Sequence, residues 1–415
     1  MLVKSSFTCN SLRIRHIASF FVNIFSTKNY ENRFVNQLSD YFQIKKESIF
    51  LFGSGRMGLY SFLKSLNLDI GDEVIIPGYT CVVVPNAIKY AGLVAKYVDI
   101  KEDTLNIDTD KLLSSITKRT KAIVVSHNFG IVYEDVKLIK KNYPDIIIIE
   151  DVAHTFGSVN NEDTKIGLLG DAAFFSLEYS KPITTGMGGI LIVNNSKLIP
   201  DVRSTYDNIG YYPRMYTNRI LITLFCHFIT SYKYSAFLKS KLMRVLQLTK
   251  LQFQSSPNEV KGEMPTYYPV RLSSTMAYLG LLQVRNLQIT NELKNKICKR
   301  YYNAFHDVPF VKDYYSIKYV YVRYPLLLKV TTQDVIKKIK RRIVEETGLT
   351  VGEWFNDVVH PKGSYRYCYT NGSCVIGEKV SREIINLPVN IHTNIGDNDL
   401  LRIKKILVEE LVRQI

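Results

Sequence analysis

The chain has 415 residues, of which 46% are hydrophobic and 22% charged, and its formal net charge is +16. This length predicts two domains, and the composition is typical of a globular protein. The six cysteines form neither a Cys-x-x-Cys pair nor a His/Cys cluster of zinc spacing, so we predict reduced thiols, a cytoplasmic protein and no metal site.

No apolar run reaches about 18 residues, so no transmembrane helix is predicted. Near the N-terminus, Arg13 and Arg15 precede the apolar stretch Ile17–Phe25, which weakly mimics a signal or transit sequence. A small-residue cleavage site is missing, so an amphipathic helix is predicted there instead.

Strand and helix patterns alternate from about residue 49 to residue 200. The expected strands are Ser48–Phe52, Val74–Pro77, Val94–Asp99, Ala122–His127, Ile146–Asp151, Phe174–Ser176 and Gly189–Val193. The expected helices are one that Gly53–Arg56 opens and that ends at Leu66, then Val83–Tyr90, and one that Asp108 caps and that ends at Ile116. Unbroken apolar strands mark a sheet buried on both faces, so the alternation favours an α/β fold with a mostly parallel sheet.

A basic segment at about 208–258 follows, and no acidic residue lies between Asn208 and Pro257. Its cations are Arg214, Arg219, Lys233, Lys239, Lys241, Arg244 and Lys250, interleaved with apolar residues such as Tyr234 and Phe237. This pattern predicts one or two basic amphipathic helices. They suit peripheral contact with an anionic membrane, at its inner face, or equally a subunit interface. No nucleic-acid recognition motif accompanies the charge, so nucleic-acid binding is not expected.

The pattern changes again towards the C-terminus. One long helix is expected from Ser273 beyond Ile297 to Tyr302, then a strand Tyr319–Lys329, a helix Thr332–Thr347, a strand Ile384–Leu387 and a final helix Asp397–Val412. We therefore predict a large domain at 1–285, which includes the basic insert, and a smaller α+β domain at 286–415.

Three residues suggest a Schiff-base chemistry. Lys181 follows an apolar strand and small residues, and Asp151 ends an isoleucine-rich strand at the edge where α/β proteins bind ligands. A lysine of lowered pKa condenses with an aldehyde, and a carboxylate can hold a pyridine nitrogen protonated, which is the pattern of a pyridoxal phosphate site. His154 lies three residues beyond Asp151 and could stack on the cofactor ring. Each also has a structural interpretation: a surface lysine, a helix N-cap and a structural histidine.

A phosphate site is predicted where Gly53–Arg56 lies between a strand and a helix, because backbone N–H groups at a helix start bind anions. Ser54 adds a hydroxyl and Arg56 a charge, although Arg56 could equally point to solvent. Ser176 is a second candidate phosphate ligand through its hydroxyl. Walker and dinucleotide patterns are absent.

In this order and spacing, the segments resemble the DegT-type (DegT/StrS) sugar aminotransferases, which are fold type I pyridoxal phosphate enzymes. The resemblance is carried by Phe52–Arg56, Gly71–Thr80, Asn86–Ile88, Val98–Ile100, Thr120–Ile123, Glu150–His154, Gly170–Ser176, Ser180–Lys181, Gly188–Gly189, Arg271–Ser273 and Leu387–Val389.

The resemblance implies roles for single residues. Lys181 would hold pyridoxal phosphate and shuttle the proton, Asp151 would pair with the pyridine nitrogen, and His154 would lie against the ring. The expected cofactor contacts are Lys181, Asp151, His154, Ser176, Ser54, Gly55, Arg56 and Tyr79. The family also forms homodimers with shared active sites.

Three positions depart from the family's pattern. Pro269 stands where an asparagine often reaches the partner subunit's phosphate, and Met187 replaces a glutamate in the glycine-rich turn. Cys81 takes the place of an aromatic residue that often covers the ring. These departures put the partner contact and the substrate recognition in question.

The resemblance implies an aminotransferase that moves an amino group, from glutamate, to a keto-sugar nucleotide in polysaccharide or glycoconjugate biosynthesis. Two alternatives stay open. A pyridoxal phosphate-dependent sugar dehydratase is disfavoured, because relatives of that kind replace the lysine with histidine and Lys181 is present. A non-catalytic, cofactor-binding or membrane-associated scaffold is the other.

Overall fold

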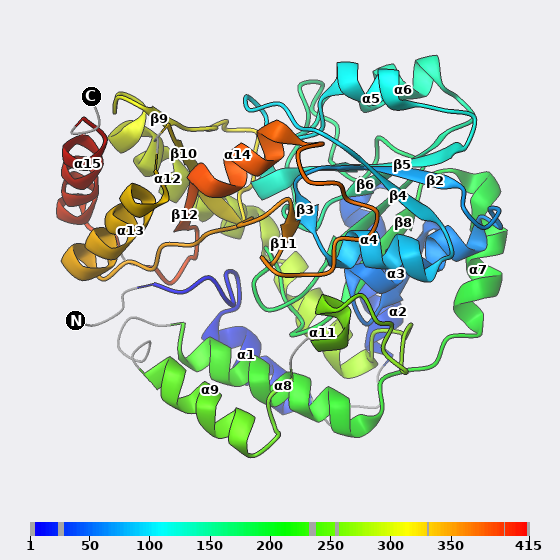
Figure 1. Ribbon diagram of the computed structural model, residues 1–415. Coiled ribbons are helices and arrows are strands. Elements are labelled where there is room, and N and C mark those ends of the chain that lie inside the picture. Colours follow the sequence, from blue (N-terminus) through cyan, green and yellow to red (C-terminus); the bar gives the residue numbers. More distant parts are fainter. Residues whose placement is uncertain are drawn as a thin grey trace.

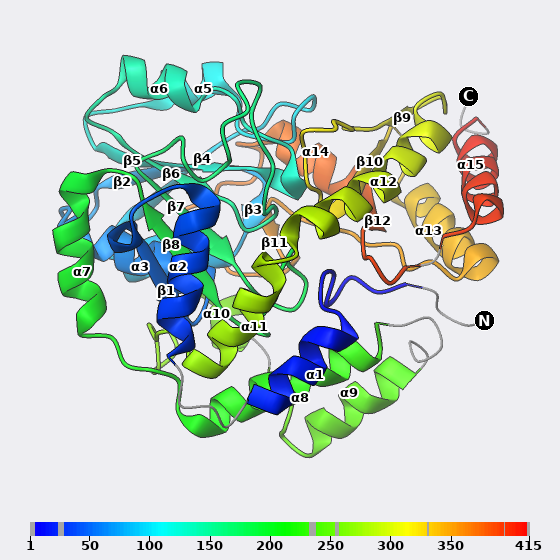
Figure 2. The same ribbon diagram turned by 180° about the vertical axis from the view of Figure 1, so that it is seen from behind.

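The larger part of the protein is built on a seven-stranded sheet of order β1-β8-β7-β6-β5-β2-β4 (Figures 1 and 2). The computed structural model describes residues 5–23, 29–231, 238–253, 257–329, 332–393 and 395–412. The strands are β1 (Ile49–Phe52), β2 (Glu73–Pro77), β4 (Val94–Val98), β5 (Thr120–Ser126), β6 (Ile147–Asp151), β7 (Ala172–Ser176) and β8 (Gly189–Val193). β8 is antiparallel to both of its neighbours and the remaining pairs are parallel, so the prediction of a mostly parallel sheet is confirmed.

Helices cover both faces of this sheet, with α5 and α6 on one side and α3 and α4 on the other (Figure 1). Their bounds are α3 (Gly55–Ser65), α4 (Val83–Tyr90), α5 (Thr109–Ser115), α6 (Val136–Asn142) and α7 (Ile199–Asp207). The predicted cap of α5 is present, because Asp108 Oδ1 accepts from Asp110 N at 3.0 Å and from Lys111 N at 3.3 Å. Strands β5 and β8 are almost entirely buried, as their unbroken apolar sequences predict.

The N-terminal helix and the basic insert lie together at the lower edge of the molecule (Figures 1 and 2). The helices around them are α1 (Ile14–Asn23), α2 (Tyr30–Phe42), α8 (Arg214–Ile229), α9 (Lys239–Leu248), α10 (Pro257–Val260) and α11 (Ser274–Val284). Phe21 of α1 packs against Phe225 of α8 with ring centroids 5.1 Å apart. The insert therefore contains two helices, as predicted, while Phe25, Lys233, Tyr234 and Phe237 lie outside the described residues.

A second hydrophobic core lies in the C-terminal part, around the antiparallel sheet β12-β10-β9. Its elements are α12 (Leu287–Phe305), β9 (Val311–Lys312), β10 (Arg323–Leu328), α13 (Gln333–Thr347), α14 (Val375–Glu383), β12 (Ile384–Pro388) and α15 (Asp397–Val412). Leu326 and Leu327 of β10 are fully buried at its centre. We propose that the domain boundary lies at the break between α11 and α12.

The prediction of one long helix from Ser273 to Tyr302 is wrong, because α11 ends at Val284 and α12 begins at Leu287. Asn286 has non-helical dihedral angles, φ −113° and ψ 15°. Its side-chain amide donates to Leu282 O at 3.0 Å, and Arg15 Nη2 donates to its Oδ1 at 2.6 Å. An asparagine that bonds locally competes with helical hydrogen bonding, and here it separates the two helices.

The predicted strand Tyr319–Lys329 is too long, since β10 begins at Arg323. The residues before it bond to loops of the large part instead of to a neighbouring strand. Val320 N donates to Ser158 Oγ at 2.7 Å, and Val322 N donates to Phe129 O at 3.1 Å. This crossing segment brings Arg323 to the face of the large domain.

The two cores meet tightly beside the carboxyl ends of the parallel strands. β3 (Thr80–Cys81) pairs with β11 (Val359–His360), and Asp99 accepts from Ile376 N and Gly377 N at the start of α14. A Cβ on Gly377 would stand 2.0 Å from Gly78 O, so only glycine allows this approach. The C-terminal part is thereby held against the sheet edge. Within the described residues, no helix has the length and hydrophobicity to cross a membrane.

Candidate active site

A cavity of about 370 Å³ lies where the carboxyl ends of β6 and β7 face the C-terminal part. Its lining includes Gly55, Arg56, Cys81, Asp151, His154, Ser176, Glu178, Lys181, Glu259, Arg323, Trp354 and His360. Most of the sequence-predicted residues therefore meet in one place. In open α/β sheets, ligands bind at this edge of the strands.

Lys181 and Asp151 both line the cavity, one in the loop after β7 and the other at the end of β6. Burial lowers the pKa of Lys181, although the carboxylates of Glu178 and Asp151 oppose this shift. Burial raises the pKa of Asp151, whose Oδ1 accepts from Ala153 N at 3.0 Å. A lysine of lowered pKa has a larger unprotonated fraction, which is the form that attacks a carbonyl.

His154 is buried and stacks on Trp354, with ring centroids 4.7 Å apart and an interplanar angle of 21°. Its Nδ1 accepts from Phe129 N at 3.2 Å. Burial, with the charges of Lys181 and Arg323, holds the pKa of His154 well below its usual value. The imidazole is therefore neutral at pH 7 and offers a flat, uncharged surface.

The predicted phosphate site has the features of an anion cradle. The Ser54 hydroxyl is buried and has no hydrogen-bond partner in the described part of the chain. A Cβ on Gly55 would stand 2.8 Å from Phe175 O, and one on Gly189 only 2.3 Å from the carbonyl carbon of Ser54. The start of α3 thus lies directly against β7 and β8, beside Ser176. An orphaned hydroxyl at a helix start fits a bound phosphate, because the ligand would satisfy it.

Arg56 lies beside this cradle, but its guanidinium has a protein partner. Its Nε and Nη2 donate to Glu259 Oε1 at 2.5 Å and to Oε2 at 2.7 Å, and both side chains are almost fully buried. This bidentate ion pair neutralises the positive charge of Arg56, which the sequence analysis had assigned to phosphate binding. Arg56 therefore joins the loop around α10 to α3.

Tyr79 is fully buried behind the cavity wall. Its hydroxyl accepts from Phe355 N at 2.9 Å and donates to Phe355 O at 3.2 Å. These bonds fix the loop that carries Trp354 to the sheet edge. In this structure Tyr79 supports a wall of the site, whereas the resemblance implied a cofactor contact.

Glu178, Arg323, Trp354 and His360 line the cavity but were missed by the sequence analysis. Glu178 lies only three residues before Lys181, so proximity could have indicated it. The other three come from the C-terminal domain, more than 140 residues later, and no local pattern places them beside Lys181. Burial lowers the pKa of His360 to about 3, so this side chain too is neutral.

The three departures have different positions. Cys81 lines the cavity, where burial raises the pKa of its thiol. Met187 is fully buried, and its carbonyl accepts from Thr185 Oγ1 at 2.6 Å. Pro269 precedes Val270, whose carbonyl accepts from Gly53 N at 2.7 Å. Only Cys81 of the three is in direct contact with the cavity.

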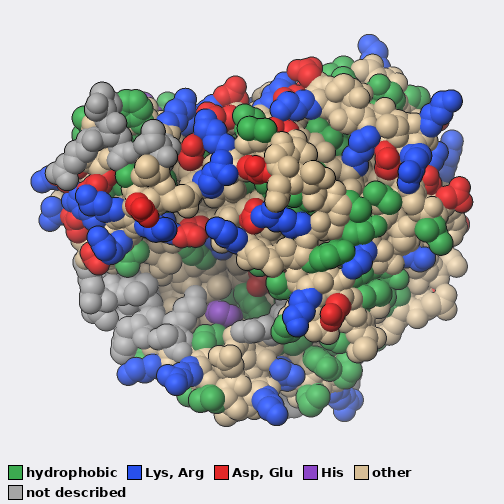
Figure 3. Space-filling model, in the orientation of Figure 1, with side chains coloured by type: hydrophobic (Ala, Val, Ile, Leu, Met, Phe, Trp, Pro, Cys, Tyr) green, Lys and Arg blue, Asp and Glu red, His purple; other side chains and the backbone are tan. Residues whose placement is uncertain are grey.

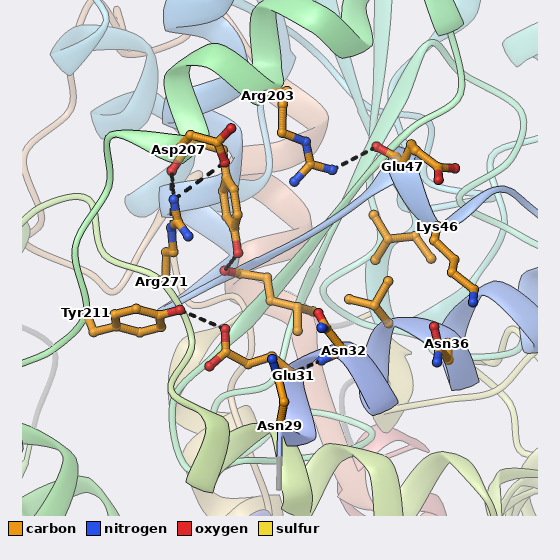
Figure 4. A pocket seen from close by; sticks show the side chains of 14 residues that line it. Asn29, Glu31, Asn32, Asn36, Lys46, Glu47, Arg203, Asp207, Tyr211 and Arg271 are labelled. Carbon is orange, nitrogen blue, oxygen red and sulfur yellow. Dashed lines mark hydrogen bonds and ion pairs between the residues drawn. The ribbon is translucent and has the colours of Figure 1, made fainter. Parts of the chain in front are cut away.

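A second, larger pocket of about 580 Å³ lies between α2, β1 and α7 (Figure 4). Arg271 donates to Tyr206 O at 2.6 Å and lies 3.7 Å from Asp207, while Tyr211 donates to Glu31 at 2.9 Å. Two pairs of its labelled side chains, Tyr211 with Glu31 and Arg271 with Asp207, contact each other, and none of the predicted catalytic residues lines it (Figure 4). The residues predicted to carry the chemistry therefore lie at the smaller cavity and not at this pocket.

Comparison with known proteins agrees with this geometry. The model of the DegT/DnrJ/EryC1/StrS aminotransferase family matches residues 18–407. The chain belongs to this family. It is therefore a pyridoxal phosphate-dependent enzyme of the aminotransferase class, and the family resemblance drawn from the sequence is confirmed.

Two relatives show how far the sequence similarity extends. An uncharacterized protein of Methanocaldococcus jannaschii, MJ1066, is 25% identical over 92% of this chain and 90% of its own length. GDP-perosamine synthase of Escherichia coli O157:H7 is 33% identical over 42% of this chain and 48% of its own length. The second match thus spans about half of each protein.

Two solved structures share the fold. Helicobacter pylori PseC, an aminotransferase involved in the biosynthesis of pseudoaminic acid, superposes with a TM-score of 0.74 at 18% identity, over 99% of this chain and 100% of PseC. The Escherichia coli GDP-4-keto-6-deoxy-D-mannose-3-dehydratase, with bound hydrated pyridoxal phosphate, superposes with a TM-score of 0.70 at 18% identity, over 99% and 100%. The type I fold predicted from the sequence is confirmed.

Proposed function

We propose that this enzyme transfers an amino group from L-glutamate to the ketone of a nucleotide-linked sugar, in polysaccharide or glycoconjugate biosynthesis. The observation that carries the proposal is the convergence of Lys181, Asp151 and Ser176 around one cavity, which Gly55 also lines, directly after Ser54 with its orphaned hydroxyl. A lysine at this position favours transamination over the dehydration alternative, because its amine can form a Schiff base with the aldehyde of the cofactor, which a histidine cannot.

Bound pyridoxal phosphate supplies an electron sink for the carbon that loses and regains a proton. We propose that the Ser54 and Ser176 hydroxyls and the Gly55 N–H bind its phosphate. Asp151 holds a proton at the pyridine nitrogen, and Lys181 Nζ first anchors the cofactor and then carries the proton at the reacting carbon. Neutral His154 covers one face of the ring without adding charge.

The half-reaction with glutamate tests the donor and the reaction class together. Wild-type protein loaded with cofactor is expected to lose its visible absorbance band when L-glutamate is added, and to release 2-oxoglutarate in equal amount. Addition of a keto-sugar nucleotide should then restore the band and produce an amino sugar, detected by mass spectrometry. A band that glutamate leaves unchanged would rule out this donor, and sugar elimination without amino-sugar formation would assign the enzyme to the dehydratases.

We also propose that the basic insert at 208–258, through α9, makes peripheral contact with an anionic membrane from the cytoplasm. Figure 3 shows basic side chains along the lower edge of the molecule, with hydrophobic side chains between them. Val245 and Leu248 of α9 are 55% and 74% exposed, and Lys241 and Arg244 on the same helix are exposed as well. Apolar residues within a basic rim suit acidic lipid headgroups.

Vesicle flotation tests this contact. Wild-type protein should float with vesicles that contain phosphatidylglycerol but not with phosphatidylcholine alone, and about 0.5 M salt should release it because exposed charges are then screened. Val245→Glu/Leu248→Glu should abolish flotation. Ile70→Glu, at an isoleucine of the large domain that is 94% exposed, should not. The idea fails if wild-type protein does not float at low salt.

We propose further that the enzyme is a homodimer with shared active sites, as its family resemblance implies. Light scattering on the same variants measures their oligomeric state, and so distinguishes a subunit interface at the α9 surface from a membrane contact there. If the Val245→Glu/Leu248→Glu variant becomes monomeric while wild type is a dimer, the surface belongs to the subunit interface and not to a membrane.

A further inference from the structure

Residues 5–12, which we call the N-terminal segment, run from the C-terminal domain to the start of α1 (Figures 1 and 2). They precede residues 18–407, the part of the chain that the family model matches. The segment is nevertheless built into the molecule, since Asn10 and Ser11 are only 1% and 2% exposed. Buried polar side chains require hydrogen-bond partners, and theirs lie in the loop that carries Lys181.

The two side chains bond to main-chain carbonyls on either side of Lys181. Asn10 Nδ2 donates to Ser180 O at 2.9 Å, and the Ser11 hydroxyl donates to Pro182 O. Ser180 and Pro182 are the immediate neighbours of Lys181 in the sequence. The N-terminal segment therefore fixes the main chain directly before and directly after the lysine.

Two further donors strengthen the hold on this loop. Cys9 N donates to Tyr179 O at 2.8 Å. Lys294 of α12 is fully buried, and its Nζ donates to Pro182 O at 3.0 Å. The carbonyl that follows Lys181 thus accepts from two side chains, one from each end of the large domain's sequence.

The N-terminal segment is itself fixed to the C-terminal domain by bonds that do not involve the Lys181 loop. Thr350 N donates to Ser5 Oγ at 2.8 Å, and Asn390 Nδ2 donates to Thr8 O at 2.9 Å. None of the described residues 5–12 lines the cavity. The segment can therefore act on Lys181 only through the loop, and not by contact with a molecule bound in the cavity.

We propose that Asn10 and Ser11 are positioning residues, which hold the main chain around Lys181 so that its amine stays at the reacting centre. This inference rests on the proposed function, in which Lys181 Nζ anchors the cofactor and then carries a proton. A lysine side chain has many rotamers, so the place of its amine depends on a fixed main chain. Reacting groups are held within about 0.5 Å of their productive geometry by supporting hydrogen bonds of this kind.

Formation of the visible band tests the position of the amine without an amino donor. Cofactor is removed from the full-length wild-type protein and its variants, pyridoxal phosphate is added back at saturation, and stopped-flow absorbance follows the band. Asn10→Ala and Ser11→Ala are each expected to slow its formation by about 10- to 100-fold, since a misplacement of about 1 Å can cost 10²-fold. Ser5→Ala is the matched control, because it removes a bond of the same segment to Thr350 and none to the loop. It should form the band at the wild-type rate.

The reloaded variants are then mixed with L-glutamate and denatured with urea. The maximal rate of band loss should fall in Asn10→Ala and Ser11→Ala, while the half-saturating glutamate concentration changes by less than about 2-fold, the pattern of a lost effect on the reaction step alone. Band formation at the wild-type rate in both variants, with only their stability lowered, overturns the proposal and leaves the proposed function standing. Equal slowing in Ser5→Ala overturns it as well. A wild-type band that ignores glutamate contradicts the proposed function, and band formation then reports on Asn10 and Ser11 separately.

Discussion

Lys181→Ala is expected to lower the rate of amino transfer from glutamate by at least about 10³-fold, since general acid–base steps of this kind contribute roughly 10² to 10⁴. In the proposed function, the variant loses the amine that anchors the cofactor and the base that moves the proton. Its visible absorbance band should disappear as well. Single-turnover absorbance measurements with L-glutamate report both effects.

The matched control for this variant is Lys197→Ala, because Lys197 is an exposed lysine of the same domain. It should keep the band and the wild-type rate. If Lys181→Ala retained a rate within about 10-fold of wild type, far above the loss expected for a missing general base, another group would be the base and the proposed role of Lys181 would be wrong.

Glu259→Leu is expected to reduce the free energy of unfolding by about 3–5 kcal/mol, the usual cost of leaving one partner of a buried ion pair unpaired. The exposed fractions of the Arg56 and Glu259 side chains are 9% and 3%, so water cannot take the place of the lost carboxylate. Arg56→Met/Glu259→Leu should recover most of the loss because it removes both charges. Urea titration followed by fluorescence measures the three variants.

Lys137 and Glu162 provide the comparison, since their ion pair is 59% and 60% exposed. Glu162→Gln should change the free energy of unfolding by less than about 1 kcal/mol. If Glu259→Leu were no more destabilising than Glu162→Gln, the pair would not hold the loop around α10 to the start of α3. Our account of Arg56 would then fail.

The sequence predicted the elements whose signals are local. The bounds of α4 and α15 are as predicted, and the strands of the large sheet differ from prediction by at most two residues at each end. Apolar runs, a capping aspartate and glycines at turns act within a few residues, so a linear pattern contains them. The break at Asn286 was missed because the apolar pattern continues across it, while the side chain of Asn286 bonds locally to Leu282 O.

The residues of the candidate site likewise fall into those that local motifs predicted and those that only the tertiary structure brought there. Motifs at the ends of strands predicted five residues of the site, which are Lys181, Asp151, His154, Ser54 and Ser176. Such motifs are informative because the carboxyl ends of parallel strands lie at one edge of the sheet in any fold of this class. The partners of these residues were not predictable. Glu259 neutralises Arg56 and Phe355 engages Tyr79 across 203 and 276 residues of sequence, respectively.

The sequence by itself thus determined the fold class, the family and the cofactor, because each follows from short motifs in a fixed order. The tertiary structure alone decided which cations in the cavity are free. Arg56 is paired, whereas Arg323 lies between two rings without a carboxylate. The physical reason is that the charge available to a ligand depends on distance and burial, and neither is written in the order of residues.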